Sequence, residues 1–139
     1  MKNLPTIFYW GVRLTAAIIM FQTLFFKFTA AEESVYIFTV AGMEPWGRIG
    51  VGIMEFIAAV LLLIPATAWL GGFLALGLML GAIGMHLTIL GIVVQDDGGY
   101  LFFLAVLVAL CSVFVLRRNA NKIVSLFSGI RQRFVRVVL

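Results

Sequence analysis

Residues 69–94 read WLGGFLALGLMLGAIGMHLTILGIVV, and His86 is the one ionisable side chain in this run. A helix needs about 20 mainly apolar residues to cross the hydrocarbon core of a bilayer, and this stretch exceeds that length. A helix that is apolar on every side is either buried in a large core or inserted in lipid. The segment therefore predicts a membrane-spanning helix, and it sets the fold class for the whole chain.

The overall composition agrees with a membrane protein. Of the 139 residues, 63% are hydrophobic and only 12% are charged, whereas soluble domains average about 45–50% apolar and about 25% charged residues. A single cysteine, Cys111, excludes an intrachain disulfide, a CxxC redox pair and a multi-cysteine metal site. Because the net charge of +4 belongs to residues at the bilayer surface, we expect no nucleic-acid partner.

The apolar runs predict four spans with approximate limits 7–27, 48–64, 69–94 and 100–116. Pro65 ends the second span because proline lacks an N–H and disfavours helix in the residue before it. Short connections between the last three spans force neighbours to run antiparallel, and the first connection has room for a short interfacial helix around 33–39. The third span carries Gly77, Gly81 and Gly84, a spacing of small residues that lets helices approach closely in lipid.

The predicted fold class is all-α: an integral-membrane four-helix bundle in residues 1–118, followed by a C-terminal amphipathic interfacial helix in a basic tail, residues 119–139. Six of the ten basic residues follow the fourth span: Arg117, Arg118, Lys122, Arg131, Arg133 and Arg136. By the positive-inside rule the tail is cytoplasmic, and four spans then place the N-terminus, with Lys2, on the same side.

In the tail, apolar residues recur at helical spacing: Ile123, Phe127, Ile130, Phe134 and Val137. This pattern, opposite basic residues, predicts a helix on the anionic head groups of the inner leaflet. The alternative is a solvated basic tail.

Ionisable residues within spans are functional candidates, because each costs roughly 2.5–3.5 kcal/mol at the centre of an inserted helix. They are Arg13 and Lys27 in the first span, Glu55 in the second and His86 in the third. At a rise of about 1.5 Å per residue, Glu55 and His86 lie roughly 12 and 13 Å below the outer surface, and Gln22 about 9 Å. The sequence therefore predicts that Glu55 and His86 share a depth.

Arg13 and Lys27 are the candidate partners of Glu55, which is the only acid within the spans. They are fourteen residues apart, close to four helical turns, so both project from one face of the first span. A lone carboxylate in lipid would take up a proton, so pairing decides its charge.

Two interpretations of these residues stay open. In the functional one, Lys27, Glu55 and His86, with Gln22 and Trp46 nearby, line a small polar pocket at the outer face that binds or protonates a lipophilic ligand such as a quinone. In the structural one, Glu55 pairs with Arg13 or Lys27, and His86 bonds a backbone carbonyl without any ligand. We expect no metal site and no covalently bound cofactor, because the spans supply no further ligands beside His86.

Over residues 8–118 the chain resembles the DoxX family of small bacterial four-span membrane proteins. The resemblance rests on Arg13 followed by 26–28 (Phe-Lys-Phe), the loop 41–45 (Ala-Gly-Met-Glu-Pro), the pair 54–55 (Met-Glu) and 84–86 (Gly-Met-His). It implies a multi-pass protein of the bacterial inner membrane, in which Arg13, Lys27, Glu55 and His86 form one site. Because related proteins are linked to thiosulfate:quinone oxidoreduction and to oxidative-stress complexes, it also implies a membrane subunit of a redox assembly, with other subunits as partners.

The sequence-based proposal is thus a DoxX-like subunit in which Glu55 and His86 exchange protons with a quinone, while Lys27 and Arg13 hold the carboxylate charged or stabilise an anionic head group. Whether the chain is itself an enzyme is left open. The alternatives are a non-catalytic scaffold of a larger complex and a small proton-coupled transporter. Six basic residues after the fourth span favour one fixed orientation, unlike the weak charge bias of small multidrug exporters.

Overall fold

The computed structural model describes residues 4–138, and the side chains of residues 5–130. Lys2 and the tail side chains beyond Ile130, among them Phe134 and Val137, lie outside the described residues. The elements in chain order are α1 (Leu4–Phe28), α2 (Glu32–Val40), α3 (Trp46–Leu63), α4 (Ala68–Met85), the π-helical turn η1 (His86–Leu90), α5 (Tyr100–Arg118) and α6 (Ala120–Val138). No strand occurs between residues 4 and 138.

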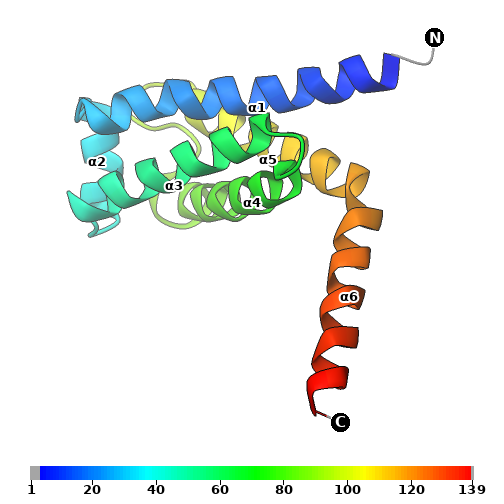
Figure 1. Cartoon of the computed structure of the whole chain (residues 1–139). Helices are drawn as coiled ribbons and strands as arrows, with labels where there is room; N and C mark the ends of the chain where they lie inside the picture. Colours follow the sequence, from blue (N-terminus) through cyan, green and yellow to red (C-terminus); the bar gives the residue numbers. More distant parts are fainter. Residues whose placement is uncertain (1–3, 139) are drawn as a thin grey trace.

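Four helical segments in this described part of the chain are long and apolar enough to span a membrane: Pro5–Phe28, Trp46–Leu63, Ala68–Leu90 and Tyr100–Arg118. The all-α four-span fold class is therefore confirmed, and the protein is a multi-pass membrane protein. Figure 1 shows the N-terminus and α6 at one end of the bundle and α2 at the other. We call these the α6 end and the α2 end.

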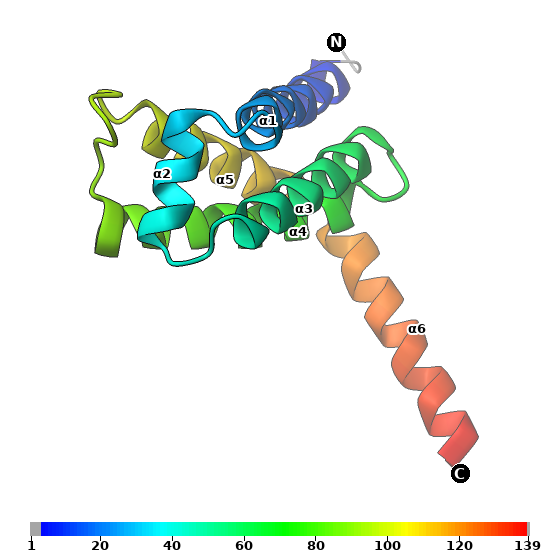
Figure 2. The same cartoon turned by 90° about the vertical axis from the view of Figure 1, so that its left-hand side faces the viewer.

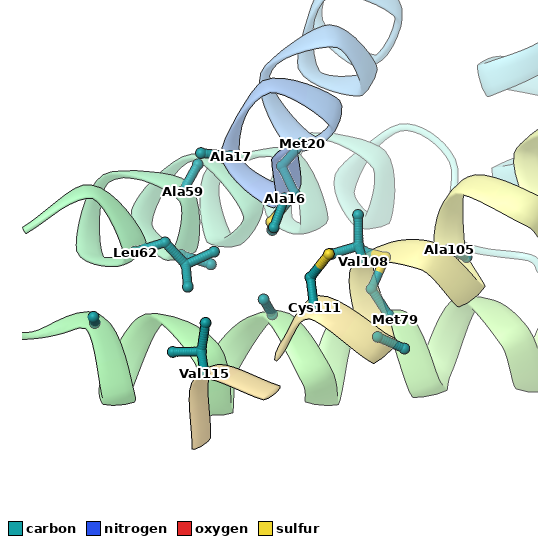
Figure 3. Packing of buried hydrophobic residues seen from close by; sticks show 14 residues of the cluster. Ala16, Ala17, Met20, Ala59, Leu62, Met79, Ala105, Val108, Cys111 and Val115 are labelled. Carbon is teal, nitrogen blue, oxygen red and sulfur yellow. The ribbon is translucent and has the colours of Figure 1, made fainter. Parts of the chain in front are cut away.

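The four long helices pack around a core of small side chains. Ala16 and Ala17 of α1, Ala58 of α3 and Ala75 of α4 are at most 1% exposed. Because an alanine adds one methyl group to the backbone, it lets helices approach closely in lipid, where packing replaces the hydrophobic effect as the driving force. Figure 3 shows larger side chains filling the remaining space between these helices, including Met20 of α1, Leu62 of α3 and Val108 of α5.

Within α4, Gly71 makes a close helix contact, whereas the glycines further along the helix do not. A Cβ added at Gly71 would lie 2.5 Å from the backbone nitrogen of Leu62, whereas at Gly77, Gly81 and Gly84 it would meet no atom within 4 Å. The expectation that these three glycines mediate close approach is wrong for the contacts within this chain. Gly71 faces α3, and the other three lie on a part of the helix that no neighbour touches closely.

The third span ends at Leu90 instead of near Val94. Gly91 follows with φ +80°, a left-handed conformation that glycine adopts without steric cost and that ends the helix. The expected helix around 33–39 is present as α2, and Figure 2 shows it lying across the α2 end of the bundle.

The loop 91–99 is organised by Asp97. Its carboxylate accepts hydrogen bonds from the backbone N–H groups of Val94, Gly99 and Leu101 at 2.9, 2.8 and 3.0 Å. Burial raises the pKa of Asp97, but the three donors and the nearby His86 outweigh burial and leave the pKa below its ordinary value of 3.8. The bond to Leu101 satisfies one of the free N–H groups at the start of α5, so Asp97 fixes where this helix begins.

Helix α6 turns away from the bundle and extends across the direction of α1 (Figure 1). Two hydrogen bonds fix its start: Asn119 Nδ2 donates to the Tyr9 hydroxyl at 2.7 Å, and Lys122 Nζ donates to the Ala66 carbonyl at 3.0 Å. Phe127 and Ile130 are more than 60% exposed. At these two positions the apolar face of α6 is therefore not covered by the described part of the chain.

Candidate functional site

A cavity of about 460 Å³ lies in the half of the bundle nearest the α2 end. It is lined by residues of α1, α2, α3, α4, η1 and α5, and most of them are apolar. The polar side chains in its wall are Gln22, Thr23, Lys27, Glu33, Ser34, Glu55, His86 and Tyr100. Its size falls in the range of pockets that enclose small molecules, about 300–1,000 Å³.

Lys27 and Glu55 form an ion pair in the wall of this cavity. Lys27 Nζ lies 2.9 Å from Glu55 Oε2, with side-chain exposures of 14% and 5%. Thr23 Oγ1 lies 3.3 Å from the same oxygen, and it donates its proton to the Met20 carbonyl at 2.9 Å. The second carboxylate oxygen, Oε1, has no hydrogen-bond partner among the described residues and remains free to accept one.

His86 is held in one orientation by the backbone that follows it. Its Nδ1 lies 2.8 Å from the Gly91 carbonyl oxygen, and because a carbonyl only accepts, Nδ1 must carry the proton. In the neutral ring the lone pair is then on Nε2, for which the described part of the chain provides no partner. The side chain is 5% exposed and lines the cavity. Its ring packs edge-on against the Phe102 ring, with 5.6 Å between the two ring centroids.

The π-helical turn explains how His86 reaches this position. A π-helical turn shifts the register of a helix and is frequent at functional sites. Here it begins at His86 and ends at Leu90, so the Gly91 carbonyl comes within reach of the ring that starts the turn.

Helix α2 contributes a third free polar group. Ser34 is 7% exposed and lines the cavity, and its hydroxyl bonds to no described residue. Phe38, one turn further along α2, is 4% exposed and lines the same cavity. Helix α2 thus covers the cavity at its end with both apolar and polar surface.

Gln22 and Tyr100 form the wall between α1 and α5. Gln22 Nε2 donates to the Tyr100 hydroxyl at 3.5 Å, and this contact is exposed. Tyr100 is therefore a residue of the cavity wall that was not among those predicted for the site.

Arg48 positions Lys27 without lining the cavity. Its guanidinium holds both carboxylate oxygens of Glu44 at 2.7–3.0 Å, and Nη1 donates to the backbone carbonyl of Lys27. This clamp ties the end of α1 to the start of α3, from which Lys27 and Glu55 project. Sequence reasoning missed it, although the i,i+4 spacing of Glu44 and Arg48 was a usable signal.

Arg13 lies apart from the cavity, which corrects the expectation that it shares the site. It is 1% exposed, and its Nε donates to the Leu62 carbonyl at 2.6 Å. That carbonyl belongs to the last turn of α3, where backbone acceptors lack helical partners. The guanidinium lies 4.0 Å from the ring centroid of Trp10. This cation–π contact stabilises the Arg13 charge in place of a carboxylate partner. Arg13 is a helix cap at the opposite end of α3.

Of the residues predicted for the site, the structure places Gln22, Lys27, Glu55 and His86 around one cavity. Trp46 does not line it and is 78% exposed. Within the described residues, no group of three or more His, Cys, Asp or Glu side chains is arranged to hold a metal ion. No family model, curated protein or solved structure matches the chain.

Proposed function

We propose that the cavity binds a lipophilic molecule with a polar head, of the quinone type, in a DoxX-like membrane subunit of a redox or stress-related assembly. The observation that carries the proposal is the set of free polar groups on Ser34, Glu55 and His86. All three side chains are more than 90% buried and line one cavity, and their unpaired polar atoms are accessible instead of sealed inside the protein. A bound polar head would supply the missing partners.

The chemistry of these groups matches the two redox forms of a quinone. The Lys27 ammonium and the Ser34 hydroxyl donate hydrogen bonds, as a quinone carbonyl requires. Nε2 of His86 and Oε1 of Glu55 accept hydrogen bonds, as a quinol hydroxyl requires. The side chains can therefore take up or return the protons that accompany quinone reduction, while a partner subunit supplies the electrons.

The proposed location is the bacterial inner membrane, with both termini cytoplasmic and the cavity near the outer face. Arg117, Arg118 and Lys122 lie at the α6 end, whereas the basic residues at the α2 end, Lys27 and Arg48, are each paired with a carboxylate. This asymmetry follows the positive-inside rule. Helix α6, with its exposed apolar face, would lie on anionic head groups of the inner leaflet, where each basic residue contributes about 1 kcal/mol.

The test is a titration of the purified protein in nanodiscs with decylubiquinone and with a short-chain menaquinone, followed by quenching of tryptophan fluorescence. We expect lipid-corrected binding in the micromolar range. Glu55→Gln and His86→Ala should each weaken it about tenfold or more, because removing one partner leaves a buried polar group of the ligand unsatisfied, at a cost of about 1–3 kcal/mol.

Thr88→Ala is the matched control, since Thr88 lies in the same π-helical turn, bonds the Gly84 carbonyl and does not line the cavity. Binding should be unchanged in this variant. If wild type binds neither quinone, or if Glu55→Gln and His86→Ala bind like wild type, the ligand proposal fails. A loss of complex assembly without any ligand binding would instead favour the scaffold alternative, in which the same contacts only lock the bundle.

A further inference from the structure

Two glycines form part of the cavity wall on α4. Gly77 and Gly81 line the cavity and are both exposed, and a Cβ added at either position would meet no atom within 4 Å. Where other helices contribute side chains to the wall, α4 contributes bare backbone at these two positions.

The packing of α3 explains why this side of the cavity is open. Near the α6 end, α3 lies tightly against α4, where a Cβ at Gly71 would be 2.5 Å from the Leu62 nitrogen. Near the α2 end, α3 closes on α1 instead, where a Cβ at Gly52 would be 3.2 Å from the ring of Phe28. In that half, no atom of α3 lies within 4 Å of a Cβ added at Gly77 or Gly81, and both helices contribute residues to the cavity wall.

We propose that Gly77 and Gly81 keep open a lateral entrance between α3 and α4, through which a bilayer-dissolved ligand reaches Glu55 and His86. This inference rests on the proposed function of the cavity. Two observations point to a membrane route: α2 lies across the end of the bundle next to the cavity (Figure 2), and the lining next to the glycines is apolar, with Leu78, Ala82 and Met85. A molecule stored in the lipid then needs no passage through water.

The chain offers a matched control in Gly84. It lies on the same strip of α4, also has no atom within 4 Å of an added Cβ, and does not line the cavity. Leucine at any of the three positions improves helix propensity. Gly77→Leu and Gly81→Leu should therefore fold, and they differ from Gly84→Leu only in what their side chains obstruct.

Entry can be measured without knowing the ligand. In a Cys111→Ala background, which removes the single native thiol, Ser34→Cys places a near-isosteric thiol in the cavity. Its rate of labelling is followed in liposomes with a bilayer-soluble pyrene maleimide and with a membrane-impermeant sulfonated maleimide. We expect Gly77→Leu/Gly81→Leu to slow the lipophilic reagent by about tenfold or more, a barrier increase of about 1.4 kcal/mol, and Gly84→Leu to leave it unchanged.

The sulfonated reagent approaches Ser34→Cys from the aqueous side, so its labelling rate should not change in the glycine variants if only the lateral entrance is blocked. If the leucines instead filled the cavity, both reagents would react more slowly. Unchanged labelling by the pyrene reagent in the double variant overturns the proposal, and so does an equal loss for both reagents. Quinone titration of the same variants keeps the two hypotheses apart. If wild type binds no quinone, the proposed function fails, and the labelling rates still decide whether the entrance exists.

Discussion

The ion pair between Lys27 and Glu55 gives the sharpest test of the site. Its atoms are 2.9 Å apart, and the two side chains are 14% and 5% exposed. At an effective dielectric constant of about 20, two unit charges at this distance attract by about 6 kcal/mol before desolvation is subtracted. Removing one partner of such a buried pair costs about 3–5 kcal/mol, because the other charge is left uncompensated, whereas replacing both partners costs much less.

We therefore expect a large coupling energy in a double-mutant cycle of Lys27→Met and Glu55→Gln. Each single variant should lower the free energy of unfolding by about 3 kcal/mol, and the double variant should lose no more than either single one. The coupling energy would then be about 3 kcal/mol, near the upper end of values for contacting residues. Unfolding by SDS in mild-detergent micelles, followed by circular dichroism, measures each free energy.

A coupling energy below about 0.5 kcal/mol, the level seen for independent sites, would refute the reasoning. It would mean that the two charges do not interact in the folded protein. Met54→Gln is a control for the glutamine itself, because Met54 precedes Glu55 and is 40% exposed. It should show no coupling to Lys27→Met.

Three further predictions follow from single contacts. Gly71→Ala should destabilise the protein by about 1–3 kcal/mol because its Cβ meets the α3 backbone, whereas Gly77→Ala should be neutral or stabilising; equal SDS midpoints would contradict this. The carboxylate of Asp97 has a lowered pKa, so its contribution to stability is present above its ordinary pKa and disappears as pH falls through the lowered value. Hydrogen exchange of the loop 91–99 should show this acid dependence, and Asp97→Asn should abolish it. Arg13→Met removes the bond to the Leu62 carbonyl and should cost about 1.5–3 kcal/mol, while quinone affinity of the folded fraction stays unchanged; weakened binding would return Arg13 to the site.

The membrane fold could be predicted from the sequence because the length and apolarity of a run are local properties. Any helix of about 20 apolar residues satisfies its own backbone hydrogen bonds in lipid, whatever its neighbours do. For the same reason, Gln22, Lys27, Glu55 and His86 stood out as rare polar groups in the outer half of their spans. Both the spans and most of the candidate site could thus be named before any contact was known.

Only the tertiary structure decided which basic side chain forms the ion pair with Glu55. Arg13 and Lys27 share one face of α1, but the choice depends on how α1 and α3 cross, and the crossing places Arg13 against the last turn of α3 instead. The same holds for the glycines, since the spacing of Gly77 and Gly81 is equally suitable for close packing and for an opening. Rotation and tilt of a helix are set by the packing of its neighbours, and no pattern along one span records them.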